Sequence, residues 1–309
     1  MSSTPTAPAL ETRTLEVPGA VLTYDVRPGP PGAPVLLLVG SPMGAEGFGT
    51  LAGYLTDRTV VTYDVRGAGR SRRTDGAPTN TPEEHADDVS AVIDAVGGGP
   101  VDLFATSGGA INALTLVARR PEQVRTLVAH EPPVVRYLPD AAEASAATHA
   151  VADAYRQGGT GPGMAAFIRL VSHRGPVTAE LAGPAPDPAG FGLPSEDDGS
   201  RDHALLAQNL IPSAHAEFDV AALRAAPTRV VVAVGAGSEG ELAHRGGEGV
   251  AAALGTAPVV FPGDHGGFMG GEFGQVGEPE AFAARLREVL DGEVPGSGVP
   301  DGGAPDDAA

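Results

Sequence analysis

The chain has 309 residues, of which 42% are hydrophobic, enough to form one large α/β domain or two smaller ones. Its formal net charge of −19 argues against nucleic acid and anionic membranes as partners, because both would repel it. The sequence has no cysteine, which excludes disulfides, zinc thiolates and thiol catalysis, and no apolar stretch approaches the ~20 residues of a membrane span. The first residues lack the charged and apolar regions of a secretory signal, so we expect a cytoplasmic protein, and the arginine-, glycine- and alanine-rich composition suggests a GC-rich bacterium.

Apolar runs and turn residues predict strands that alternate with helices. Residues 1–11 are expected to be a disordered lead-in. Strands are predicted at Thr12–Val17, Val21–Val26, Val35–Val39, Thr59–Asp64, Val101–Ala105, Val124–Ala129, Arg229–Val234 and Pro258–Phe261. Helices are predicted at Phe48–Leu55, Thr81–Val96, the stretch after Ser107, Gly240–Leu254 and Pro279–Leu290. This alternation is typical of a doubly wound, mostly parallel sheet, with a core made of residues 12–131 and 227–290.

Residues 132–226 interrupt the alternation. Helical patterns occupy Ala141–Gln157 and Met164–Val171, residues 175–199 are rich in Pro, Gly and Asp, and no apolar strand run occurs. A helical insertion between two core strands predicts a lid over a site at the sheet edge. The tail, 291–309, is acidic and rich in Gly and Pro, and is expected to be disordered.

The stretch Val101–Leu116 predicts a strand, a very tight turn and a helix, with Ser107 at the apex. Such an apex is strained and needs small neighbours, which Ala105 and Gly109 provide. The pattern small-Thr-Ser-Gly-small resembles the nucleophile elbow of the α/β-hydrolase family, although alanine replaces its usual first glycine. In such a turn the serine hydroxyl stands above the sheet, and the backbone N–H of Gly108 faces a developing oxyanion.

Two further motifs follow the order of this family. The stretch Tyr63–Ser71 is similar to its (Y/D)-x-R-G-x-G-x-S loop, and a late strand ends in Phe261-Pro262-Gly263-Asp264-His265. His265 resembles the family's catalytic base, and it alone among eight histidines falls in a loop at the carboxyl end of a predicted strand. The resemblance covers about residues 12–130 and 227–290, and implies a serine nucleophile activated by histidine.

The acid of the predicted triad is ambiguous. The resemblance implies a carboxylate in the loop after the penultimate strand, but residues 235–238 are glycine, alanine and serine there, with Glu239 next. Glu131 ends the strand after the elbow helix, where some α/β-hydrolases, including a group of haloalkane dehalogenases, place their acid. We favour Glu131 and keep Glu239 as the alternative.

The second oxyanion donor is expected from the loop after Val35–Val39. Pro42 has no N–H, and Ser41 matches the donor position of the family's His-Gly-x-Pro loop, although Val39 replaces the histidine. Met43 is the weaker candidate. Ser41 and Gly108 are therefore the predicted oxyanion hole.

The predicted function is a serine hydrolase that cleaves a small ester, thioester or lactone through an acyl-enzyme, without cofactor or metal. Residues 235–240 fit G-x-G-x-x-G, but too little chain follows to build a nucleotide-binding half. His130 and Glu131 are adjacent on a strand, point to opposite faces and form no metal motif. A small molecule is the expected partner, and the sequence leaves the oligomeric state open. A cofactor-free perhydrolase and a non-catalytic binding protein of the same fold are the alternatives.

Overall fold

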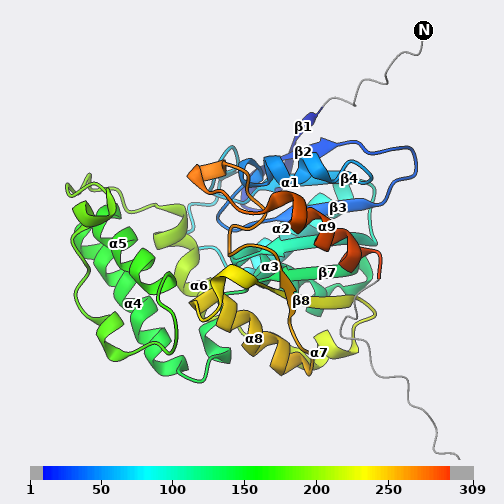
Figure 1. Cartoon of the computed structure of the whole chain (residues 1–309). Coiled ribbons are helices and arrows are strands. Elements are labelled where there is room, and N and C mark those ends of the chain that lie inside the picture. The colour runs from blue at the N-terminus through cyan, green and yellow to red at the C-terminus, as the bar shows by residue number, and fades with distance from the viewer. Residues whose placement is uncertain (1–9, 293–309) are drawn as a thin grey trace, which may run out of the picture.

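The computed structural model describes residues 10–292, and the strands in this range form one nine-stranded sheet (Figure 1). Its order is β1-β2-β4-β3-β6-β7-β8-β9, with the short β5 paired to β2. The first two pairings, β1 with β2 and β2 with β4, are antiparallel, and the pairings from β4 to β9 are parallel. The strands are β1 (Glu11–Val17), β2 (Ala20–Arg27), β3 (Val35–Val39), β4 (Thr59–Asp64), β5 (Arg72–Arg73), β6 (Val101–Thr106), β7 (Val124–His130), β8 (Arg229–Gly235) and β9 (Val259–Phe261).

Helices cover both faces of the sheet. Alternate strand residues point to opposite faces, so Leu37 packs into a core with α2, α3 and α8, whereas Leu36 packs into a second core with α1 and α9. Both faces are covered, which is why the central strands are continuous apolar runs. The helices are α1 (Gly49–Tyr54), α2 (Pro82–Ala95), α3 (Gly108–Arg119), α4 (Ala141–Gly158), α5 (Thr160–Val171), α6 (Leu210–Ala214), α7 (Val220–Ala225), α8 (Leu242–Leu254) and α9 (Pro279–Leu290).

The predicted doubly wound fold is confirmed, and most element boundaries agree within two residues. Helix α5 is an exception, because it begins at Thr160 rather than Met164. Glycines weaken the helical pattern there, but close packing requires them: a Cβ on Gly161 would lie 1.8 Å from the carbonyl oxygen of Pro194. Strand β1 begins at Glu11, within the segment expected to be disordered. The expectations for 1–9 and 293–309 fall outside the described residues.

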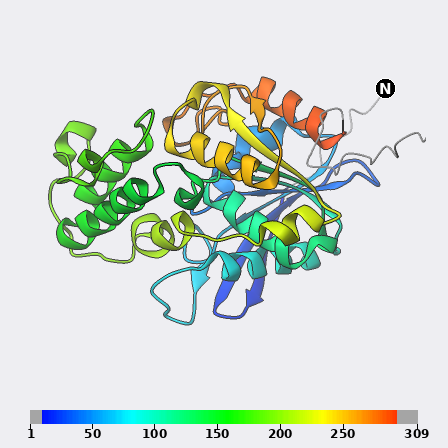
Figure 2. The same cartoon turned by 90° about the horizontal axis from the view of Figure 1, so that it is seen from below.

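The segment between β7 and β8 (131–228) contains α4 to α7 and no strand; α4 and α5 correspond to the two predicted helices, whereas α6 and α7 were not predicted. Figures 1 and 2 both show α4 and α5 on one side of the molecule, beyond the sheet. The segment has its own apolar core, which includes Val151, Tyr155 and Leu170. One turn of π-helix, Ala204–Asn209, precedes α6. None of the helices within 10–292 is both long and apolar enough to cross a membrane.

The inserted segment is anchored to the start of α8 and to the β8–α8 loop (236–241). Arg245 of α8 binds Asp140 and donates to the Gly175 carbonyl at 2.8 Å. The Gly175 N–H donates to the Gly240 carbonyl at 2.9 Å, and Arg174 Nη2 donates to the Gly237 carbonyl at 2.7 Å. These contacts fix the segment against the same loop that approaches the candidate site.

Candidate active site

Ser107 lies at the turn between β6 and α3 with φ 56° and ψ −131°, a backbone conformation that residues other than glycine rarely adopt. Its N–H donates to the His130 carbonyl at 2.9 Å, which ties the turn to β7. The glycines that follow allow close packing on β3: a Cβ on Gly109 would lie 2.3 Å from the Val39 carbonyl oxygen. The predicted elbow geometry is therefore present.

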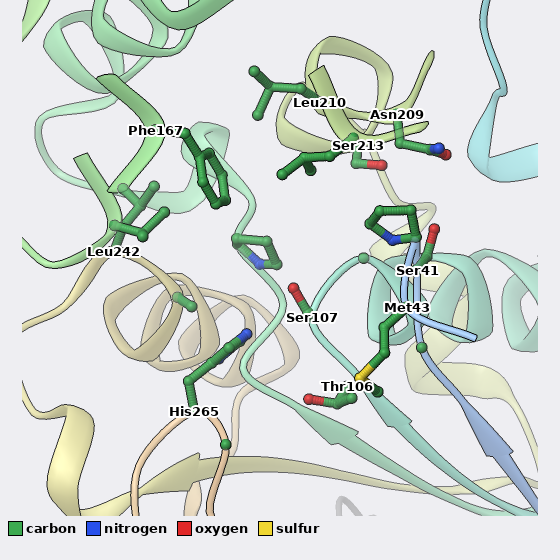
Figure 3. A pocket seen from close by; sticks show the side chains of 18 of the residues that line it. Ser41, Met43, Thr106, Ser107, Phe167, Asn209, Leu210, Ser213, Leu242 and His265 are labelled. Carbon is green, nitrogen blue, oxygen red and sulfur yellow. The ribbon is translucent and has the colours of Figure 1, made fainter. Parts of the chain in front are cut away.

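The loop after β3 lies against the first turn of α3. A Cβ on Gly108 would be 2.6 Å from the Ser41 carbonyl oxygen, so only glycine fits. Ser41 is 6% exposed, and Figure 3 shows it with Met43 beside Ser107. The N-terminus of α3, with its free backbone N–H groups, also faces this space. The two residues predicted to form the oxyanion hole are thus neighbours at the same edge of the sheet.

His265 follows β9 and hydrogen-bonds to Glu131 with 2.6 Å between Nδ1 and Oε2. Because a carboxylate only accepts, Nδ1 carries the proton and Nε2 remains the basic nitrogen. In Figure 3 the outer ring nitrogen of His265 and the Ser107 hydroxyl face the same space. No hydrogen bond between these two side chains is among those of residues 10–292, and such bonds often tighten only when substrate binds.

Glu131, rather than Glu239, is the carboxylate that contacts His265. Glu131 is fully buried just beyond β7 with φ 49°, and its N–H donates to the Ala233 carbonyl at 2.9 Å. Glu239 is exposed in the β8–α8 loop. The strained backbone at Glu131 turns its carboxylate toward the end of β8 and toward His265.

Two residues that support Glu131 were not predicted from the sequence. Ser238 is fully buried, and its hydroxyl donates to Glu131 Oε1, which also accepts the Gly235 N–H at 2.9 Å. His244 of α8 places Nδ1 3.6 Å from the same oxygen and donates to the Gly235 carbonyl at 3.0 Å. The sequence signal that could have pointed to Ser238 was its position, because it is a serine in the loop where the family commonly has aspartate.

The electrostatics couple Glu131 and His265. Burial alone would raise the pKa of Glu131, but the nearby His244 ring, the hydrogen bond from His265 and the charge of His265 outweigh burial and hold that pKa well below its usual range. Burial alone would lower the pKa of His265, but the hydrogen bond and charge of Glu131 outweigh it and raise that pKa. Glu131 is therefore a carboxylate at neutral pH, and it stabilises the protonated form of His265.

His130 packs behind the site rather than in a metal centre. Its ring is fully buried, hydrogen-bonds to Thr106 Oγ1 at 3.0 Å, and stacks 6.1 Å from the ring of His265. Burial lowers the pKa of His130 to about 4, so the ring is neutral at pH 7. Across 10–292, no group of three His, Asp or Glu side chains is arranged to hold a metal ion.

The other two sequence motifs are structural in this chain. Arg66 is 3% exposed and binds both carboxylate oxygens of Asp88 at 2.7 Å, which fixes α2 to the loop after β4. The G-x-G-x-x-G stretch supplies Gly235 and Ser238, both of which hold Glu131. Neither motif contributes a side chain to the cavity described next. Glu241, the residue that follows the second motif, does line it.

A cavity of about 450 Å³ opens above Ser107 and His265 (Figure 3). Its floor comes from the sheet edge and its walls from the inserted segment and the start of α8. Most of the lining is apolar and includes Met43, Phe167, Leu205, Leu210, Leu242 and Met269. Asn209, at the end of the π-helix, is held in place by His85, whose Nε2 lies 2.7 Å from Asn209 Oδ1. The cavity has the size and polarity of a small-molecule site.

Comparisons with known proteins agree with this fold. The family model for the alpha/beta hydrolase fold matches residues 33–189. A curated relative, the uncharacterized hydrolase YraK of Bacillus subtilis (strain 168), is 38% identical over 127 residues, which is 40% of this chain and 46% of that protein. The match thus spans less than half of the relative. The chain belongs to the α/β-hydrolase fold family.

Solved structures share the fold over most of the chain. A thermophilic esterase from Thermogutta terrifontis superposes with a TM-score of 0.62 at 22% identity, covering 91% of this chain and 98% of that one. The carboxylesterase CesB from Bacillus subtilis has a TM-score of 0.62 at 17% identity, covering 93% of each chain. The enol-lactonase from Burkholderia xenovorans LB400 has a TM-score of 0.55 at 18% identity, covering 90% of this chain and 100% of that one.

Proposed function

We propose that this protein is a serine hydrolase that cleaves a small ester, thioester or lactone. Ser107 is the nucleophile, His265 the general base and Glu131 the acid that orients His265. The N–H groups of Ser41 and Gly108 form the oxyanion hole. The hydrogen bond between His265 Nδ1 and Glu131 Oε2 carries this proposal, because it leaves Nε2 of His265 basic and facing the same cavity as Ser107. The esterases and the lactonase among the structural neighbours are consistent with it.

The mechanism follows from these positions. His265 Nε2 takes the Ser107 proton as the serine oxygen attacks the substrate carbonyl, and the two backbone N–H groups bind the resulting oxyanion. His265 then gives its proton to the leaving group, and an acyl-enzyme remains. A water molecule, deprotonated by His265, attacks the acyl carbonyl, and as the second oxyanion collapses and breaks the bond to Ser107, His265 returns the proton to the serine oxygen, which releases the acid and restores both side chains. Glu131 stays ionised throughout and stabilises the imidazolium form of His265.

We also infer that the inserted segment acts as a lid that selects the substrate. Support comes from Phe167 and Leu170 of α5 and Leu210 of α6, which line the cavity opposite the sheet edge. The sheet edge would then supply the chemistry, and the inserted helices would supply the fit. This division of roles also follows the predicted domains, 12–131 with 227–290 and 132–226.

Labelling with a fluorophosphonate probe tests the nucleophile. The folded wild-type protein should be labelled rapidly, and the Ser107→Ala variant should not be labelled at all. Peptide mapping of the labelled protein should locate the probe on Ser107. A folded wild-type protein that is not labelled would refute the proposal and would favour a binding protein without catalytic activity.

A further inference from the structure

The ionisable side chains of the cavity above Ser107 suggest which substrates it accepts. Among the described residues that line it, the ionisable ones are Glu241, Asp264 and His265. Neither lysine nor arginine is in the lining, and the whole chain contains no lysine. Apart from these groups the lining is apolar or carries uncharged hydroxyl and amide groups, so it offers no cationic partner to an anionic substrate.

The arginine that contacts Glu241 is already engaged. Arg174 Nη2 contacts Glu241 Oε1 at 3.0 Å and donates to the Gly237 carbonyl at 2.7 Å. Its side chain is 59% exposed and does not line the cavity. Arg174 thus offsets part of the Glu241 charge from outside the lining, and the Glu241 carboxylate remains the charged group of this pair that lines the cavity.

The positive groups at the base of the cavity have other partners. His265 is paired with the Glu131 carboxylate, so the pair adds no net positive charge to the site even when the ring is protonated. The N-terminus of α3 faces the position of the reacting carbonyl oxygen. During the proposed reaction this oxygen accepts the hydrogen bonds that the backbone N–H groups of the N-terminus can donate. A carboxylate or phosphate elsewhere on the substrate would lose water, gain no cationic partner and lie near two acids.

From this arrangement we infer that the cavity excludes substrates with an anionic group in either the acyl or the alcohol part, and that Glu241 is a specificity-determining residue for this exclusion. Esters with a free carboxylate and thioesters of phosphate-bearing carriers belong to the excluded class. The ester chemistry rests on the proposed function, whereas the charge selectivity is a property of the cavity alone.

Binding to the Ser107→Ala variant tests the selectivity without turnover. The probes are 4-butyryloxybenzamide and 4-butyryloxybenzoate, which have nearly the same shape and differ in charge. Isothermal titration calorimetry at mildly alkaline pH should give a Kd for the benzoate that is at least about tenfold weaker than for the benzamide. Equal affinities, tighter binding of the benzoate, or no binding of either probe would overturn the inference.

A matched pair of variants in the same background tests Glu241. Glu241→Gln removes the charge beside the cavity and releases Arg174, so the ratio of the two dissociation constants should shrink severalfold. Glu248→Gln is the control, because Glu248 lies on α8, the helix that follows Glu241, with its side chain 55% exposed, and does not line the cavity. An unchanged ratio in Glu241→Gln, or an equal change in both variants, would overturn the role of Glu241.

Hydrolysis by the wild-type protein separates this inference from the proposed function. If Ser107→Ala binds the benzamide selectively but the wild type does not hydrolyse it, the hydrolase proposal fails and the selectivity stands. If the wild type hydrolyses both esters with the same kcat/KM, the hydrolase proposal stands and the selectivity fails.

Discussion

Replacing Glu131 with glutamine should remove most of the activity while leaving the shape of the site nearly unchanged. With an effective dielectric constant of about 20, a unit charge 2.6 Å from the protonated His265 is worth about 6 kcal/mol. The His265 side chain is 41% exposed, so water screens part of this interaction and about 3 to 5 kcal/mol remains. We therefore expect kcat to fall by about 10²- to 10⁴-fold in Glu131→Gln.

The pH dependence adds a second readout for the same variant. Glu131 raises the pKa of His265, and the general base must be neutral to accept the Ser107 proton. Without the carboxylate, burial lowers that pKa, so the acidic limb of the kcat/KM profile should move to lower pH in Glu131→Gln. Hydrolysis of a 4-nitrophenyl ester across a pH series measures both effects, and circular dichroism checks the fold.

The same substitution at Glu239 provides the control. Glu239 is exposed and does not contact His265, so Glu239→Gln should keep both the wild-type rate and the wild-type pH profile. The reasoning is refuted if Glu131→Gln, folded and stable, retains the wild-type rate, or if Glu239→Gln loses activity in its place.

Three further predictions follow from the packing around the site. Ser238→Ala removes a hydrogen bond to the buried carboxylate of Glu131, so urea denaturation should show a loss of about 1.5–3 kcal/mol in the free energy of unfolding; no loss would contradict the bond's importance. Gly108→Ala would place a Cβ 2.6 Å from the Ser41 carbonyl oxygen, so kcat should drop by at least about 10²-fold in a steady-state assay, and a fully active variant would argue against this oxyanion hole. His130 has a pKa of about 4 when folded, against 6.5 for the free side chain, so the unfolded chain binds more protons between these values. Its contribution is present above pH 6.5 and is lost as pH falls to about 4. The buried His85, whose pKa burial also lowers to about 4, contributes over the same range, so the loss of stability between pH 6.5 and 4, measured by denaturation, should be smaller by about 3 kcal/mol in His130→Gln than in the wild type.

Much of the fold was predictable because both faces of the sheet are covered. Strands β3 and β4 coincide with their predicted ranges, since continuous apolar runs have clear ends at polar or glycine residues. Helix α2 was equally clear, because Thr81 and Glu84 form a capping box and proline occupies the first turn. The start of α5 was not predictable, because its glycines allow close packing against residues far away in the sequence, and a local sequence pattern does not reveal such packing.

The candidate site was only partly predictable for a related reason. Ser107 and His265 occupy turns whose local sequence predicts them, so they could be singled out without any knowledge of tertiary contacts. The acid could not be decided, because Glu131 and Glu239 both follow strands that end at the same sheet edge. Three-dimensional contacts separate them: the β8–α8 loop turns Ser238 inward toward Glu131 and leaves Glu239 in solvent. The role of Ser238 depends entirely on this long-range contact.

The β8–α8 loop has a consequence for engineering the specificity of this protein. One side of the loop holds Glu131 through Ser238, and the other side holds the inserted segment through Arg174 and Gly175. The helices that shape the cavity are therefore not an independent module. A chimera that imports α4 to α6 from a relative would disturb the contacts that position Glu131, the partner of the proposed general base His265, unless residues 235–241 are transplanted with them.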